Sequence, residues 1–245
     1  MPTILHQGRQ LRYAVRRTPR KKTAALKIYP DGRVEMLSPR AMSLEDLRLF
    51  VSRRAKWIWE RQDYFRNLTL KNPVKEIKSG ETFPVLGRNF RLKLKREPGL
   101  KTPYCRRQGR GLEIWVDGQT GPALKDAAWR ALREWYFELT EKSAKAAVHK
   151  YAKALAVKPQ RLKIGDQSKR WASCSKSGDI RFNWRLSMMP ISVLEYVVVH
   201  ELCHLKTHDH SPRFWRVVKS LLPDYEKRRD WLRRCGAEIV SILED

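Results

Sequence analysis

The segment from Val193 to Trp215 constrains this chain more than any other, because it sets metal-binding side chains into an apolar helical pattern. Its centre is the HExxH motif HELCH, from His200 to His204. Each residue of an α-helix turns the chain by about 100°, so the two histidines lie about 40° apart and one turn along the axis. Two imidazoles in that position can bind the same metal ion. The spacing therefore predicts a metal site on a helix over residues 191–206.

The residues around the motif favour metal binding over a chance match. Apolar side chains precede and interleave with it, at Val197–Val199, Leu202 and Leu205. We therefore expect both histidines and Glu201 to be buried, where they need a partner such as an ion. Four of the six histidines also lie within residues 200–210, as a set of ligands requires.

A third ligand has four candidates, which are His208, Asp209, His210 and the distant Glu226. On a continuing helix, His208 would lie two turns, about 12 Å, from the first histidine and almost in line with both others. Tetrahedral zinc disfavours such a line. The Ser-Pro pair at residues 211–212 predicts a new helix, so the residues before it form a turn. We predict that this turn folds His210 over the metal and leaves His208 either behind the ligands, in contact with them, or facing the substrate.

Two further residues of the motif have different predicted roles. Glu201 lies beside the ligands but is angled away from the ion, so we predict that it is the general base. It would take a proton from a water molecule whose pKa zinc lowers towards about 7. Cys203 points about 60° to the far side of His200, into the apolar face, so we expect a packed thiol there rather than a ligand.

Strand and helix patterns alternate along the rest of the chain. Strand patterns occupy Leu11–Arg16, Ala24–Tyr29, Val34–Leu37, Thr82–Leu86, Asn89–Leu94, Leu112–Val116, Leu162–Ile164 and Ile180–Trp184, and Pro30-Asp31-Gly32 predicts a hairpin turn. Helical patterns run from Ser43 to about Phe65, over Pro122–Ala156, and from Ser211-Pro212 and Pro223-Asp224 onward. We predict an α+β fold with a linker in residues 67–80, which Asn72-Pro73 punctuates.

The charge of the chain indicates a polyanionic partner. Lys and Arg number 52 and Asp and Glu 26, so the formal net charge is +26. Such a charge favours nucleic acid, nucleotides or anionic lipid. The densest basic runs are Arg16–Lys22, Arg106–Arg110 and Lys227–Arg234, and each has a plainer interpretation as a solvated surface. We predict a nucleic-acid-binding face of little sequence preference, with solubility or small anionic substrates as the alternative.

Other features bear on the compartment. The four cysteines have no CxxC spacing, so we expect reduced thiols. The first residues lack the pattern of a secretory signal, and no run approaches the roughly 18 apolar residues of a membrane span. We therefore expect a soluble, cytoplasmic protein without a membrane partner.

Four motifs occur in order and together resemble the YgjP-like metallopeptidase family, which is related to the SprT-like and WLM zinc proteases. They are RWASC at residues 170–174, IRFNWRL at 180–186, HELCH at 200–204 and HSPRFW at 210–215. The family usually has Gly where this chain has Ala172. The resemblance implies a zincin-like metallopeptidase domain over residues 67–245. A small β-rich region over residues 1–66 would precede this domain or be integrated with it.

The resemblance also implies roles for single residues. His200, His204 and His210 would bind Zn²⁺, and Glu201 would be the general base. The strand at residues 180–184 would border the cleft as an edge strand, able to pair with an extended peptide, or would equally be an ordinary core strand.

Several residues flank this region. Arg170 and Asn183 are candidates for polarising a scissile carbonyl or holding an anionic substrate, and equally for satisfying buried backbone groups. We expect the aromatic side chains of Trp171, Phe214 and Trp215 to lie in the core rather than to contact substrate.

Three functions fit these features. The first, which we predict, is a zinc-dependent peptidase that acts on a peptide or protein and that its charge recruits to nucleic acid. The second is a metal-dependent nucleoside triphosphate pyrophosphatase, an activity associated with members of the family. The chain has no P-loop, so Arg and Lys side chains would have to hold the nucleotide. The third is a nucleic-acid-binding protein with a non-catalytic zinc site, against which the intact Glu201 argues.

Overall fold

The computed structural model of this chain describes residues 2–6, 8–19, 23–29, 32–71, 75–167 and 170–242, with their side chains except those of residues 64–71 and 241. The chain forms two compact units, Met1–Val74 and Lys75–Asp245. The buried apolar side chains form two separate clusters, one in each unit. Both units contain strands and helices, which confirms the predicted α+β class.

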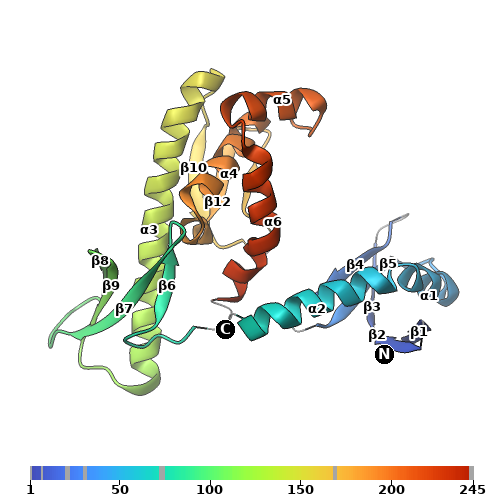
Figure 1. Cartoon of the computed structure of the whole chain (residues 1–245), viewed down its shortest axis with the longest axis horizontal. Coiled ribbons are helices and arrows are strands. Elements are labelled where there is room, and N and C mark those ends of the chain that lie inside the picture. The colour runs from blue at the N-terminus through green and yellow to red at the C-terminus, as the bar shows by residue number, and fades with distance from the viewer. Residues whose placement is uncertain are drawn as a thin grey trace. The chain divides into compact units, whose positions relative to one another are not determined.

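The first unit holds a hairpin, a three-stranded sheet and two helices (Figure 1). Its elements are β1 (Thr3–His6), β2 (Arg9–Arg12), β3 (Ala14–Thr18), β4 (Ala25–Ile28), β5 (Val34–Pro39), α1 (Leu44–Ser52) and α2 (Ala55–Lys71). Strands β1 and β2 pair with each other, and the sheet has the order β3-β5-β4. Met36 of β5, Leu47 of α1 and Ile58 of α2 are fully buried in the core between them.

Two local predictions for this unit are confirmed. β4 and β5 pair antiparallel, as the predicted hairpin requires, although Pro30 and Asp31 of its turn lie outside the described residues. The backbone N–H of Asp46 donates a hydrogen bond to the hydroxyl of Ser43 (3.0 Å), which caps α1 as predicted.

Two other predictions for this unit are wrong. The strand predicted at residues 11–16 is divided between β2 and β3, with the buried Tyr13 between them. The helix predicted to end near Phe65 is instead two helices, separated by a turn at residues 53–54. This turn lets Val51 of α1 and Ile58 of α2 both reach the core.

The second helix continues to Lys71, so the predicted domain boundary after residue 66 lies within α2.

The second unit is built around a long helix, two small sheets and three further helices. Its strands are β6 (Thr82–Val85), β7 (Arg88–Arg96), β8 (Tyr104–Gln108), β9 (Gly111–Val116), β10 (Arg161–Gly165), β11 (Ala172–Cys174) and β12 (Asp179–Asn183). Its helices are α3 (Gly121–Leu155), the 3-10 helix η1 (Trp184–Met188), α4 (Ile191–His204), α5 (Pro212–Leu221) and α6 (Tyr225–Ser241). The sheets have the orders β6-β7-β9-β8 and β10-β12-β11.

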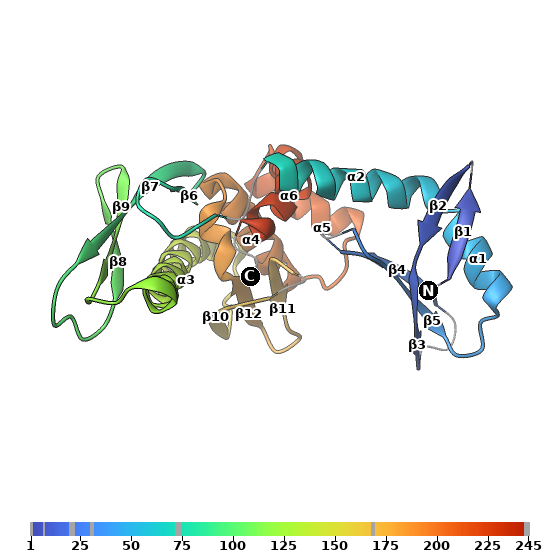
Figure 2. The same cartoon turned by 90° about the horizontal axis from the view of Figure 1, so that it is seen from below.

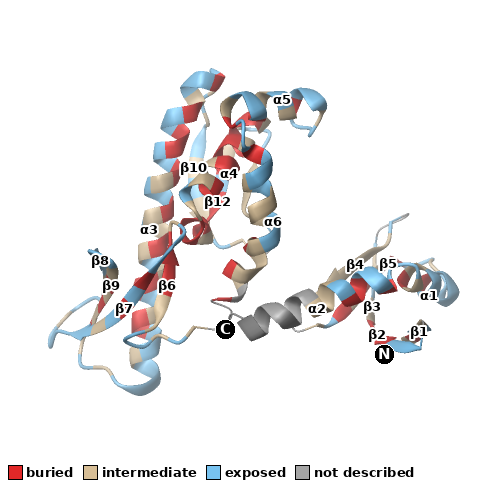
Figure 3. Cartoon of the chain, in the orientation of Figure 1, coloured by how far each residue is buried: buried red, intermediate tan, exposed pale blue. Residues whose placement is uncertain are grey.

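Helix α4 lies at the centre of this unit. It packs against α3, α6 and the edge strand β11, as Figures 1 and 2 show. Its apolar side chains point in most directions, and those from Val197 to Val199 are almost completely inaccessible. Figure 3 shows that much of the ribbon around α4 is buried. A helix that is apolar on most sides belongs in a core, which explains why α4 is surrounded.

The helical predictions for this unit agree with the structure to within a few residues. The long helix predicted at residues 122–156 is α3, and the helix predicted at 191–206 is α4. Strands β8 and β11 were not predicted. All four cysteines are free. No helix in the described part of the chain is long and apolar enough to cross a membrane.

Candidate metal centre

Helix α4 supplies the HExxH side chains from its last turn. It ends at His204, and the backbone N–H of Leu205 donates to the carbonyls of Cys203 and Leu202 as the helix closes. The one-turn spacing puts the rings of His200 and His204 beside each other, with centroids 4.8 Å apart. The motif therefore lies on a helix, as predicted.

The segment between α4 and α5 brings a third histidine back to this pair. Ser211 caps α5, since its hydroxyl accepts a hydrogen bond from the backbone N–H of Phe214 (3.4 Å), and Pro212 is the first residue of the helix. The carboxylate of Asp209 accepts a further hydrogen bond from the backbone N–H of Ser211 (3.2 Å). These bonds fix the turn that carries His210, in the way the Ser-Pro pair predicts.

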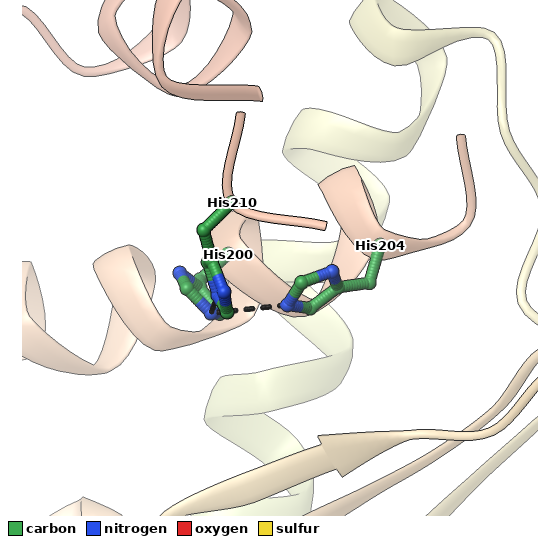
Figure 4. A group of neighbouring side chains, drawn as sticks. All are labelled: His200, His204 and His210. Atoms are coloured by element: carbon green, nitrogen blue, oxygen red, sulfur yellow. Dashed lines mark hydrogen bonds between the residues drawn. The ribbon is translucent and has the colours of Figure 1, made fainter. Parts of the chain in front are cut away.

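The three imidazoles converge on one point (Figure 4). The Nε2 atom of His200 lies 3.2 Å from that of His204 and 3.1 Å from that of His210. Nitrogen atoms that share a tetrahedral zinc ion at its usual bond length stand about 3.3 Å apart. The spacing therefore fits a shared ion, and the three residues form a candidate metal-binding group.

Neighbouring groups orient these rings. The Nδ1 atom of His204 lies 3.0 Å from the backbone carbonyl of Thr207, and an N–H on that atom leaves Nε2 with a free lone pair. The ring of Phe214 packs against all three histidines, with centroid distances of 5.0, 4.8 and 5.0 Å to His200, His204 and His210. An aromatic side chain thus limits the rotation of each candidate ligand.

Burial keeps the first two imidazoles neutral. Burial, together with the charges of His204 and His210, lowers the pKa of His200 to about 3. Burial also lowers the pKa of His204. Neutral imidazole is the form that binds a metal, so these rings need no deprotonation near neutral pH.

Glu201 is buried beside the group, with 7% of its surface exposed. Burial raises the pKa of its carboxyl to about 7, and the positive charge of Arg170 opposes that rise. The charge of Glu201 contributes in turn to raising the pKa of the Cys174 thiol in β11. The carboxyl therefore lies within electrostatic reach of both Arg170 and β11.

The order of the small sheet corrects one expectation. The strand at residues 180–184, expected to border the cleft as an edge strand, is β12 (Asp179–Asn183), which pairs with β10 on one side and β11 on the other. The edge strand that contacts α4 is β11. Ala172 pairs with Phe182 in this strand and does not have a positive φ, so its methyl group is compatible with the local backbone.

The three residues predicted to contact substrate have different surroundings. Arg170 is exposed, and its charge reaches Glu201. His208 is exposed and lies outside the converging group. Asn183 is almost fully buried, and its Nδ2 donates to the carbonyls of Gln167 (2.7 Å) and Arg170 (3.2 Å). Its Oδ1 accepts from the N–H of Arg185 (3.0 Å), so this side chain is occupied by backbone groups.

The other residues expected to be in the core contribute to it, as predicted. Cys203 and Phe214 are almost fully buried. Trp171 and Trp215 are half-buried and pack against the same core. Two features of the site are not predicted from the sequence, namely the backbone carbonyl of Thr207 and the strand β11. Neither is marked by a pattern of side chains.

One comparison with known proteins agrees with this chemistry. The family model described as YgjP-like, metallopeptidase domain, matches residues 22–235. No curated protein matches the chain. Among solved structures, the chain is similar to the crystal structure of the metallopeptidase zymogen of Pyrococcus abyssi abylysin, with 23% sequence identity. That match covers 43% of this chain and 99% of the other, with a TM-score of 0.34.

Proposed function

The chain belongs to the YgjP-like metallopeptidase family, and we propose that it is a zinc-dependent peptidase with Glu201 as its general base. One observation carries the proposal, namely that three imidazole Nε2 atoms converge beside a buried carboxylate. Catalytic zinc sites typically have three protein ligands and one open position, whereas structural sites have four. Within the described ranges, no fourth His, Cys or carboxylate joins the three histidines. This donor set fits catalytic zinc held by His200, His204 and His210.

The chemistry divides between the ion and the protein. Bound zinc would lower the pKa of a water molecule towards 7 and polarise a substrate carbonyl. Glu201 accepts the proton of the attacking water and delivers it to the leaving nitrogen. The raised pKa of its carboxyl suits a group that must both accept and release a proton near neutral pH. Arg170 is near enough to this carboxyl to stabilise negative charge on the substrate.

The edge strand β11 favours a peptide as the substrate. Among the residues that the structure describes, it pairs with β12 on one side only, so an added strand would pair along its other edge. It also lies against α4 and near Glu201. An extended peptide paired with β11 would therefore run past the proposed base. A nucleotide has no peptide backbone and so cannot pair with a strand edge in this way.

The test asks whether one preparation of the protein hydrolyses peptide bonds or phosphoanhydride bonds. Zinc-loaded protein is incubated with unfolded casein and, separately, with nucleoside triphosphates, and each reaction is repeated with Glu201→Gln. We expect cleavage of casein alone, and loss of that cleavage in the variant. Hydrolysis of the triphosphates alone, lost in the variant, would instead support the pyrophosphatase. A zinc-loaded protein inactive on both would support a non-catalytic site.

A further inference from the structure

The four-stranded sheet β6-β7-β9-β8 has one covered face and one open face. The covered face carries apolar residues of β7 and β9, such as Leu92, Leu112 and Ile114, which are fully buried, and α3 packs against β8 and β9. Side chains alternate between the two faces along each strand. The open face is therefore formed by the intervening residues of β7, β8 and β9, which are Arg91, Lys93, Lys95, Tyr104, Arg106, Gln108, Glu113 and Trp115.

Strand pairing arranges these side chains in rows. Lys95 of β7 and Tyr104 of β8 both pair with Trp115 of β9. Two residues away along β9, on the same face, Glu113 pairs with both Lys93 of β7 and Arg106 of β8. Paired residues point to the same face of a sheet, so one row joins a lysine to two aromatic rings and the next joins two cations to a carboxylate.

Two aromatic rings of this face are stacked on each other, and one of them, Tyr104, is exposed. The rings of Tyr104 and Trp115 lie nearly parallel, at 7° to each other, with centroids 6.2 Å apart. Tyr104 has 37% of its surface exposed, whereas Trp115 beneath it is half-buried. The guanidinium of Arg106 lies 5.1 Å from the centre of the Trp115 ring system.

The charge of this face is strongly positive. It holds four cations, Arg91, Lys93, Lys95 and Arg106, against the single carboxylate of Glu113, which gives 4 − 1 = +3. Glu113 bonds to Arg106 (3.0 Å), which leaves the three cations of β7 to face solvent. Alternate residues of a strand are about 6.8 Å apart, so these cations form a regular line along β7.

We propose that this open face binds single-stranded nucleic acid. An unpaired base stacks on the exposed ring of Tyr104, which Trp115 supports from behind, and the phosphates contact Arg91, Lys93 and Lys95. Aromatic rings on an open sheet, flanked by cations, are a general means of holding unpaired bases, which a duplex keeps hidden within its stack. Both interactions are common to all sequences, so RNA and DNA strands bind with similar affinity and little base preference.

Two of the three basic runs that stand out in the sequence are weaker candidates, whereas the third, Arg106–Arg110, contributes Arg106 to this face. In the run from Lys227 to Arg234, Arg228 forms ion pairs with Glu195 (3.2 Å) and Asp224 (2.9 Å) and leaves only 16% of its side chain exposed. Arg229 packs over the ring of Trp215. In the run from Arg16 to Lys22, residues 20–22 lie outside the described part of the chain. Neither run presents an exposed aromatic surface within the described residues.

The experiment measures binding of fluorescently labelled RNA, DNA of the same sequence, and the matching duplex to the full-length zinc-loaded protein at low salt. The Lys93→Gln/Lys95→Gln variant should bind more weakly and lose about 1.4 from the log-log salt slope, at about 0.7 for each phosphate contact on a single strand. The matched control, Lys142→Gln/Lys158→Gln, removes two exposed cations elsewhere and should retain the wild-type slope.

Variants of the aromatic surface separate stacking from charge. Tyr104→Ala should weaken binding of single strands by about 5- to 150-fold without changing the salt slope, and Tyr104→Phe should bind like the wild type. Zinc content and peptidase activity should stay unchanged in all these variants, so the result is independent of the proposed function. Undetectable binding, equal binding of duplex and single strands, or an unaltered affinity of Tyr104→Ala would each overturn the proposal.

Discussion

At the scale of single residues, Glu201 combines burial with nearness to the three histidines. Burial raises the pKa of its carboxyl, so a neutral amide costs less to bury at this position than an ionised carboxylate. Glu201→Gln should therefore keep the fold and the zinc content. Its turnover should fall by about 10² to 10⁴, because a positioned general base contributes about that factor. Steady-state kinetics with elemental analysis of the same sample tests both expectations. Full turnover in the variant would rule out Glu201 as the base.

The histidines allow an equally direct comparison. The Nε2 atom of His210 lies 3.1 Å from that of His200, whereas His208 is exposed and outside the group. His210→Ala should lose most of the bound zinc, and the matched variant His208→Ala should keep it. Elemental analysis after purification without added metal measures the two zinc contents. The opposite pattern would replace His210 by His208 in the ligand set.

At the scale of elements, the start of α5 positions the proposed third ligand. The hydroxyl of Ser211 caps this helix, and removal of such a cap costs about 1 kcal/mol of stability. The turn that carries His210 should loosen as a result. We expect Ser211→Ala to lower zinc affinity about tenfold, since groups that support metal ligands contribute 10- to 100-fold. Ser211→Asp, which restores a capping acceptor, should recover most of that loss in a competition assay with a chelator.

The same scale explains what the sequence can and cannot predict. Helices α3 and α4 are visible in the sequence because many residues repeat the same apolar spacing. The turn before α5 is visible because Ser211 and Pro212 have separate, local preferences for a helix start. Strand β11 has only three residues, all half-buried, and so provides no pattern to detect. The central place of β12 depends on pairings between distant segments, which local spacing does not encode.

The position of a charged surface is likewise predicted only in part from the sequence. The run from Lys227 to Arg234 is prominent in the sequence, yet the structure pairs Arg228 with carboxylates of α4 and α6 and places Arg229 over an aromatic ring. The cations of β7 stand out far less, because apolar residues separate them. Only the alternation of the strand gathers them on one face. A charged surface is thus better predicted from strand or helix periodicity than from runs of consecutive charges.

At the scale of the whole molecule, the two separate apolar clusters give each compact unit a core of its own. The candidate zinc ligands all belong to the second unit, on α4 and in the turn before α5. Zinc that binds only the folded form adds about 2.7 kcal/mol of stability at a free concentration 100 times its dissociation constant. That stabilisation should act on the second unit alone.

Removal of zinc should therefore destabilise one part of the chain selectively. After chelation, we expect faster amide hydrogen exchange in peptides from α4, α5 and the turn between them, because the ion no longer joins these segments. Peptides from β1 to β5 should exchange at unchanged rates, since their core contains none of the candidate ligands. Mass spectrometry of exchanged peptides measures both sets in one sample, and restored zinc should reverse the change. Equal acceleration in both units would show that they unfold together, and no acceleration in α4 and α5 would argue against zinc at the three histidines.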